Sequence, residues 1–359
     1  MRLERRTHVP LSLACAAPIA AVLVALVLSG ILIAIAGAPV LEAYRRILIG
    51  AFGSRLSITE TLTRATPLIL TGLAVAVAFR ARLWNIGAEG QFYLGALTAA
   101  ALGSSGVLPL PSPVLIPVLM LAGAAAGAVF LLLPLGLRLR FGVDEVVTTL
   151  LLNFVVILFV SMMIDGPLRD PMAFGWPQSV PVTPDALLPK LLPRSRLHIG
   201  LLVALGAAVL LAVLLSRTVF GLESRAAGLS PKAARFAGVG LTGVLVKVAL
   251  LSGGFAGLAG AIEVMGLKGY VTTDLSPGYG YSGIVVAMLA GLNPLGVVAA
   301  ALFVAVMFVG VDGMSRALGV PSFLADVTVS LSLLTMLVGM LFTQYRVVFD
   351  RRVRPDAAP

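Results

Sequence analysis

The chain is dominated by long apolar runs without charged residues, which short polar segments separate. The longest run covers residues 90–137, which are uncharged at all 48 positions. Because a helix needs about 20 apolar residues to cross the hydrocarbon core of a bilayer, this run predicts two spans. Small polar residues at 104–106 and three prolines within 109–113 predict the turn between them.

The remaining runs predict further spans. Residues 7–41 follow a cluster of arginines and are longer than the apolar part of a signal peptide, so they predict an uncleaved first span. An Asn-Pro pair at 293–294 divides the run 275–311 into a short helix and a full one. The expected spans lie near 11–36, 65–79, two within 90–137, 146–164, 197–216, 236–265, two within 275–311 (the first near 281–292), and 327–345.

Composition supports the same fold class. Hydrophobic residues make up 59% of the 359 positions and charged residues only 12%, against about 25% charged residues in soluble chains. We therefore expect an all-α polytopic membrane protein of about ten transmembrane helices, some of them short or broken. The 26 Lys and Arg side chains are scattered rather than gathered into a dense basic block, which indicates cationic flanks of membrane helices and argues against a nucleic-acid partner.

The distribution of Lys and Arg also predicts an orientation. An even number of spans places both termini on one side, and the segments on that side carry the excess of cations expected of the cytoplasmic face. They are residues 1–10, 80–82, 138–140, 217–240 and the tail from 346. The opposite side then contains two longer loops, 38–64 and 165–197.

Few side chains are suited to redox, metal or acid–base chemistry. The chain has one cysteine and two histidines, which leaves no internal disulfide and no metal-ligand spacing. With few carboxylates inside the spans, no arrangement typical of a membrane enzyme is present. The phosphate-binding pattern Gly-x-x-x-x-Gly-Lys-Ser/Thr is absent as well, so this chain does not hold ATP phosphates in that way.

A polar stretch interrupts the apolar pattern just before residue 92. Asn85, Glu89 and Gln91 stand at the start of an otherwise apolar helix, and because Asn85 and Glu89 are four residues apart, we expect both to lie on one face of it. A charge at bilayer depth is costly and usually faces a cavity, a partner or a pathway. The alternative is that Glu89 pairs with Arg80 or Arg82 and fixes helix packing.

Two weaker candidates lie in the span 146–164. Thr149 and Asn153 are four residues apart and so share one helix face, which is compatible with lining a pathway. Small polar side chains also join helices to one another within membranes, and that alternative stays open.

Paired start and stop signals occur in the segment 217–240. Ser230 suits an N-cap, Pro231 the first helical position and Gly238 the C-terminal stop, so a short helix is expected between them. A similar turn precedes it and ends at Gly228. Two short helices joined tightly would form a stiff projection with a cationic rim of Arg225, Lys232 and Arg235. The alternative is a structured loop that lies on lipid headgroups.

Several of these stretches resemble one protein family. The runs that carry the resemblance are Leu83–Gln91, Arg225–Gly238, Gly166–Pro171 with Gln178-Ser179, and Arg196–Gly200. They are similar to the permease subunits of bacterial ABC importers in the branched-chain amino acid and simple-sugar superfamily, in particular its nucleoside branch. The likeness extends from about residue 40 to 345.

The resemblance implies a single transmembrane permease domain over 1–345, with an extracytoplasmic loop at 165–197 and a cytoplasmic tail at 346–359. It implies that the loop 217–240 docks on a separate cytosolic ABC ATPase, which binds ATP and Mg²⁺ while this chain binds no cofactor. The residues that correspond to the coupling element are Arg225, Gly228, Ser230, Pro231, Ala233, Ala234, Arg235 and Gly238.

By the same resemblance, Asn85, Glu89 and Gln91 lie beside the substrate pathway. A second, related permease subunit would complete the pore, and an extracytoplasmic solute-binding protein would deliver nucleosides or related sugars across the bacterial inner membrane. The competing hypothesis is an ion-coupled secondary transporter that acts alone, with Glu89 as its titrating group.

Overall fold

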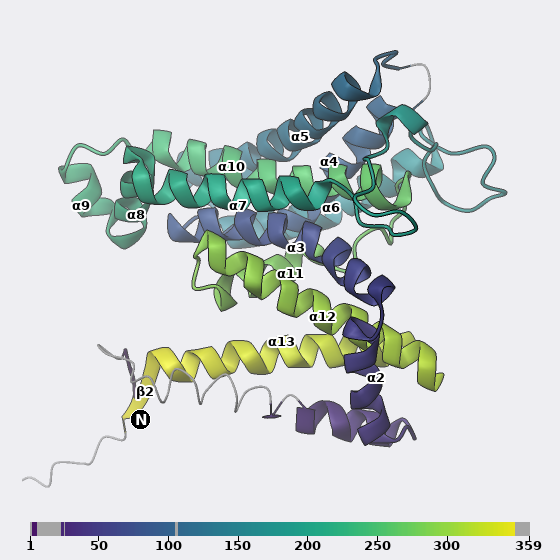
Figure 1. The fold of residues 1–359 in the computed structure, drawn as a ribbon. Helices are drawn as coiled ribbons and strands as arrows, with labels where there is room; N and C mark the ends of the chain where they lie inside the picture. Colours follow the sequence, from purple (N-terminus) through teal and green to yellow (C-terminus); the bar gives the residue numbers. More distant parts are fainter. Residues whose placement is uncertain (1, 6–22, 25, 105–106, 349–359) are drawn as a thin grey trace, which may run out of the picture. The chain divides into compact units, whose positions relative to one another are not determined.

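The computed structural model describes residues 2–5, 23–24, 26–104 and 107–348. Within this part of the chain the fold is helical apart from one short strand pair, in which β1 (Arg2–Arg5) runs antiparallel to β2 (Tyr345–Val348). The expected all-α class is confirmed. The helices are α2 (Val40–Phe52), α3 (Arg55–Arg80), α4 (Ala88–Gly103), α5 (Ser112–Phe141), α6 (Glu145–Asp165), η1 (Pro184–Ala186), α7 (Gly200–Arg217), α8 (Val219–Leu229), α9 (Pro231–Phe236), α10 (Leu241–Glu263), the π-helical η2 (Val264–Lys268), α11 (Tyr279–Leu289), α12 (Pro294–Leu318) and α13 (Ser322–Gln344) (Figure 1).

Six helices in the described residues are long and apolar enough to cross a membrane. A bent pair, Leu26–Ile35 and Val40–Phe52, meets at 116° and raises the number to seven if the pair is one span. The expected total of about ten remains a prediction. Most of the first expected span, 11–36, and the tail after residue 348 lie outside the described residues.

The segment 38–64 differs from expectation. The sequence pattern predicted an outer loop there, but the structure contains α2 and the first turns of α3. Ser54 caps α3 by accepting a hydrogen bond from the Ser57 amide. The hydroxyls of Thr61 and Thr63 donate to carbonyls four residues earlier, which allows polar side chains inside a buried helix. The span expected at 65–79 therefore begins earlier, at Arg55, because charged and hydroxyl-bearing residues are part of the helix.

The chain divides into two compact units, Met1–Ile47 with Val311–Pro359, and Leu48–Gly310. In the first unit, the Tyr44 hydroxyl donates to the carbonyl of Leu26 and so joins the start of α2 to the preceding helix. The strand pair β1–β2 also belongs to this unit, with Arg2 opposite Val348.

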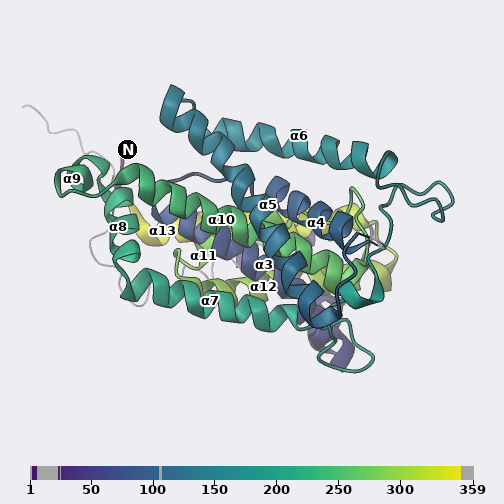
Figure 2. The same cartoon turned by 90° about the horizontal axis from the view of Figure 1, so that it is seen from above.

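The second unit is built around α3, α4 and α10. In the membrane-length window of α3, 89% of the residues are buried, against 28% in α6. Helices α6 and α7 lie on opposite sides of this centre (Figure 2). A Cβ at Gly253 would overlap the backbone of Gly127, so α5 and α10 approach more closely than side chains would allow.

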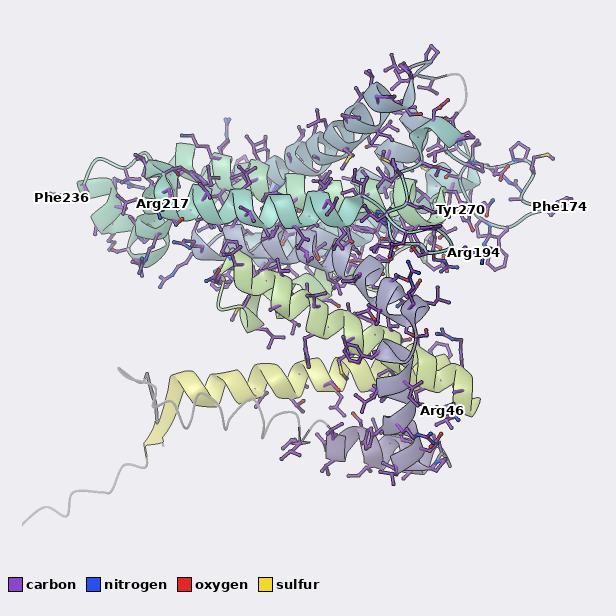
Figure 3. The ribbon with its side chains drawn as sticks, in the orientation of Figure 1. Arg46, Phe174, Arg194, Arg217, Phe236 and Tyr270 are labelled. Carbon is purple, nitrogen blue, oxygen red and sulfur yellow. The ribbon has the colours of Figure 1, made fainter. Side chains whose placement is uncertain are left out.

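The two ends of the second unit are distinct. Phe236, in α9, marks one end, and Phe174, in the loop 166–199, marks the other (Figure 3). We call them the α9 end and the loop end. Helices α5 and α7 start at the loop end and finish at the α9 end, whereas α4, α6 and α10 run the opposite way (Figures 1 and 2). The polar stretch 82–91 connects α3 to α4 on the α9 side.

Candidate functional site

A partly buried turn at residues 81–87 separates α3 from α4. Arg82 adopts a left-handed backbone conformation with φ of 53°, and the Leu83 amide donates to the Ala78 carbonyl 3.0 Å away, which ends α3. The residues that follow are non-helical until Ala88. Non-helical backbone inside a membrane protein must find partners outside its own helix. Here, side chains of α6 and α10 supply much of the bonding.

Asn85 is the centre of the first group of hydrogen bonds. Its Nδ2 donates to Gln91 Oε1 and to Ser252 Oγ, each at 2.9 Å, and its Oδ1 accepts from the Gly87 amide and from Gln91 Nε2. The Ser252 hydroxyl in turn donates to the Ala74 carbonyl at 2.7 Å. An asparagine amide has two donors and two acceptor sites, so Asn85 is fully satisfied. It joins α3, α4 and α10 at one point.

The expectation that Asn85 and Glu89 share one helix face is wrong. Asn85 precedes α4, which begins at Ala88, and its side chain turns back to Gln91 instead. The physical reason is the Asn85 side chain itself, which accepts the amide hydrogen bond of Gly87 two residues later and so stabilises a turn rather than a helix.

Thr149 and Asn153 of α6 complete the bonding of this segment. Thr149 Oγ1 accepts from the Ile86 amide at 3.2 Å. Asn153 Oδ1 accepts from the Gly90 amide, and its Nδ2 donates to the Ile86 carbonyl, both at 2.9 Å. The structure thus brings both α6 residues against the same turn that contains Asn85. We refer to Asn85, Gln91, Thr149, Asn153 and Ser252 as the turn cluster.

Glu89 is buried and faces a different helix. Its Oε2 accepts from the Gly280 amide at 2.6 Å, in the first turn of α11. The Ser276 hydroxyl and the Tyr281 amide also face this carboxylate. With 11 residues, α11 is about 16 Å long, roughly half of the hydrocarbon core. A carboxylate at the start of this half-helix satisfies its free amides and complements its dipole.

No salt bridge joins Glu89 to Arg80 or Arg82 among the described residues. Glu145, at the start of α6, forms the salt bridge to Arg138 at 2.7 Å, and Arg138 also donates to the Arg82 carbonyl. The sequence analysis did not identify the α11 residues around Gly280 as part of the site. A Tyr-Gly-Tyr run at 279–281 was the available signal for a close backbone approach: a Cβ at Gly280 would overlap the backbone of Glu89.

The segment 217–240 forms the two short helices that its caps predicted. Ser230 Oγ accepts from the Ala233 amide at 3.3 Å, Pro231 opens α9, and Gly238 is left-handed with φ of 85°. Helix α8 begins at Val219 after its cap at Thr218 and continues to Leu229, so Gly228 lies inside the helix rather than at its end. The projection therefore contains α8, α9 and their connection at Ser230.

This projection is fixed to the end of α3 but exposes apolar side chains. A Cβ at Gly228 would overlap the Arg80 carbonyl, so α8 lies directly on the α3 backbone. Ala234 is buried, whereas Ala233, Arg225 and Arg235 are exposed. Phe236 is 97% exposed, and Leu222 and Leu229 are also exposed (Figure 3). No group of three or more metal-ligating side chains occurs among the described residues.

The broken helices, the buried polar turn and the capped projection define a polytopic membrane permease. Residues 57–345 match the family described as "Branched-chain amino acid transport system / permease component", and the chain belongs to this family. It is a permease subunit of an ABC importer, whose ATPase is a separate subunit.

Curated relatives agree with this assignment. The chain is 36% identical to the glucose ABC transporter permease protein TsgB13 of Haloferax volcanii, over 98% of this chain and 95% of the relative. It is 33% identical to the guanosine ABC transporter permease protein NupP of Bacillus subtilis, over 88% and 91%. A second protein of that organism, the guanosine ABC transporter permease protein NupQ, is 28% identical over 68% and 78%. No solved structure matches the chain.

Proposed function

We propose that this permease forms half of the pathway for uptake of nucleosides or related sugars. The relatives named for guanosine and glucose transport support this substrate class. Two different permeases named for guanosine transport in one organism support a second, related permease as the other half of the pore. Transport is driven by a cytosolic ATPase that docks on the segment 217–240, in a bacterial inner membrane with both termini of this chain in the cytoplasm.

The observation that carries the docking proposal is the exposed apolar tip of a rigid projection. Phe236, Leu229 and Leu222 are exposed in helices whose ends are capped, and Gly228 seats α8 on the end of α3. Exposed apolar groups surrounded by charge are typical of a protein interface. Because α8 contacts α3 directly, a force on the projection reaches the turn cluster through only a few residues.

The turn cluster and Glu89 hold the broken helices beside the substrate pathway in position. The polar side chains Asn85, Glu89, Gln91, Thr149 and Asn153 are buried within this chain and bonded to backbone groups or to one another. This arrangement favours positioning of the broken helices over direct contact with substrate. It also gives no support to a lone, ion-coupled transporter in which Glu89 is free to titrate.

The loop end provides the surface for an extracytoplasmic solute-binding protein. Met172, Phe174 and Trp176 are exposed at the tip of the loop 166–199. The Asp170 carboxylate accepts from the Met172 amide and from Gln178 Nε2, each at 2.9 Å, which keeps the base of the tip ordered. The tip extends beyond the helix ends (Figures 1 and 3), where a soluble partner could reach it.

Reconstitution tests the proposal. The chain, its co-encoded second permease, ATPase and solute-binding protein are placed in liposomes, and uptake of radiolabelled guanosine and of glucose is measured. We expect uptake only with ATP and all four components. Accumulation by this chain alone under an ion gradient would refute the importer assignment, and ATP-driven uptake of neither solute would refute the substrate class.

A further inference from the structure

At the loop end, α10 finishes in a π-helical turn instead of an α-helical one. After Glu263 the chain continues as the π-helix η2, which closes with the Gly269 amide donating to the Val264 carbonyl at 2.8 Å. Because that amide reaches back five residues, the Met265 carbonyl is left for another donor, and the Leu188 amide of the loop 166–199 binds it at 2.9 Å. π-Helical turns inside longer helices occur mostly at functional positions.

His198 lies between this π-turn and the start of α7. A Cβ at Gly266 would lie 2.5 Å from His198 Nε2, and a Cβ at Gly200 would lie 2.6 Å from His198 Nδ1. The imidazole therefore occupies a slot that exists only because both neighbours are glycines. The residue is 1% exposed, and the Arg196–Gly200 stretch that contains it was a sequence feature without an assigned role.

The hydrogen bonding of His198 fixes its tautomer. Nδ1 accepts from the Gly200 amide at 3.2 Å, so the ring proton is on Nε2. Nε2 is buried without a hydrogen-bond partner among the described residues. A second proton would place two donors, Nδ1–H and the Gly200 N–H, against each other and would bury a charge. The site accepts the neutral ring only.

The slot is connected to the rest of the site through the segment 269–278. The Val182 amide donates to the Gly269 carbonyl, and the Ser179 amide donates to the Val271 carbonyl, so the outer loop also holds the chain beyond η2. Further along, the Tyr93 hydroxyl donates to the Thr273 carbonyl and accepts from the Ser276 amide. The segment then enters α11, where Gly280 meets Glu89.

We propose that His198 is a positioning residue for transport: its neutral imidazole, wedged between Gly200 and Gly266, holds the end of α10 in its π-helical form. That form places the segment 269–278, and through it the start of α11 at Glu89. The outer loop, on which the proposed solute-binding protein docks, is thereby joined to the half-helix. This inference rests on the proposed function.

Protonation of His198 at low pH should destabilise its position between Gly200 and Gly266. Burial lowers the pKa of His198 to about 4, from an ordinary value near 6.5. Because the folded form resists protonation, the wedged state loses stability as the pH falls from about 6.5 to about 4, up to about tenfold in equilibrium constant per pH unit. The charged groups on the adjoining elements are Lys190 and Arg196 on its own loop, and Glu263 and Lys268 on α10 and η2. Arg196 pairs with Glu60, and Lys268 with Asp274.

The test uses the assembled four-component importer. His198→Asn keeps an acceptor for the Gly200 amide and cannot titrate, so we expect uptake near wild type at pH 7 and a flatter profile between pH 6.5 and 4. His198→Ala removes the acceptor and the wedge, and we expect uptake to fall at least about tenfold. We also expect faster amide hydrogen exchange over residues 264–278. Gly206→Ala, in α7 where an added Cβ meets nothing within 4 Å, is the matched control and should change neither.

A second pair of variants distinguishes a specific effect of the His198–Gly266 contact from a general loss of folding. Gly266→Ala should impair uptake because its Cβ meets the imidazole, and combining it with His198→Ala should restore part of the loss, since the clash is then gone. If His198→Ala transports within twofold of wild type with unchanged exchange over 264–278, or if His198→Asn keeps the wild-type pH profile, the proposal is overturned. A wild-type complex without ATP-driven uptake would instead refute the proposed function.

Discussion

Single side chains carry much of the connection between helices in this permease. Glu89 links α4 to α11, and Asn85 links α3, α4 and α10, in each case through groups far apart in the sequence. Inside a membrane protein an unmet polar group is costly, because little water is present to replace a lost partner. Changes at these two residues should therefore have effects that differ in kind.

Replacing Glu89 with glutamine keeps the size of the side chain and an oxygen that can accept from Gly280, but removes the charge. A charged hydrogen bond is roughly twice as strong as a neutral one. We expect Glu89→Gln to reduce ATP-driven uptake by about three- to tenfold, with normal amounts of folded protein, because α11 is held less firmly. Asp165→Asn, at the exposed end of α6, is the control. Uptake at the wild-type rate in Glu89→Gln would show that the charge has no role.

Replacing Asn85 with leucine should destabilise the protein itself. The change leaves the Gly87 amide and the Gln91 side chain without partners and removes the bond that Ser252 Oγ accepts, at a cost of about 1–3 kcal/mol for each buried polar group left unsatisfied. We expect a clear fall in the thermal unfolding midpoint of the purified permease in detergent. Asn293→Leu, which removes only an exposed cap at the start of α12, should lower the midpoint less. An equal effect of the two changes would contradict the role of the turn cluster.

Among the helices, the contact between α8 and α3 decides how the projection moves. Gly228 lies on the Arg80 carbonyl, and any side chain there must push α8 away. In contrast, a Cβ at Gly243 in α10 meets nothing within 4 Å. The two glycines therefore form a natural comparison, since both lie in helices.

Gly228→Ala should uncouple transport from ATP hydrolysis. In the reconstituted importer we expect ATPase activity to persist while uptake falls at least about tenfold, because a displaced α8 transmits less movement to α3. Gly243→Ala should be neutral or slightly stabilising, since alanine restricts the unfolded chain more than glycine does. Uptake per ATP hydrolysed is the measurement. Full coupling in Gly228→Ala would remove this contact from the proposed mechanism.

The molecule as a whole offers two exposed aromatic tips at opposite ends of its second unit. Phe236 is 97% exposed at the α9 end and Phe174 is 99% exposed at the loop end (Figure 3). Aromatic side chains are frequent among the few residues that dominate binding at an interface. Under the proposed function, each tip serves a different partner.

Alanine substitutions at the two tips should therefore have complementary effects. Phe236→Ala should weaken binding of the ATPase by about thirtyfold or more, the effect of losing about 2 kcal/mol at an interface, and leave binding of the solute-binding protein unchanged. Phe174→Ala should do the reverse. Both affinities can be measured on the permease pair in nanodiscs. Loss of ATPase binding in Phe174→Ala but not in Phe236→Ala would reverse the proposed orientation.

The helical class, most of the apolar spans and the capped helices around Ser230 could be predicted from the chain alone. These features depend on local pattern: apolar length, cap residues and glycine stops act on neighbours within one or two turns. The same reasoning failed at 38–64, where hydroxyl side chains that bond within their own helix were taken for a loop. It also failed for the relative directions of Asn85 and Glu89.

Only the tertiary structure decided which groups meet. Gly280 lies 191 residues from Glu89, and Gly266, which borders His198, follows it by 68 residues that include α7, α8, α9 and α10. A local pattern carries no information on such pairings, because they follow from how close the helix backbones come and from where small residues permit contact. The sequence thus shows that these polar residues sit within the membrane domain, and packing determines that they bind one another across α3, α4, α6, α10 and α11.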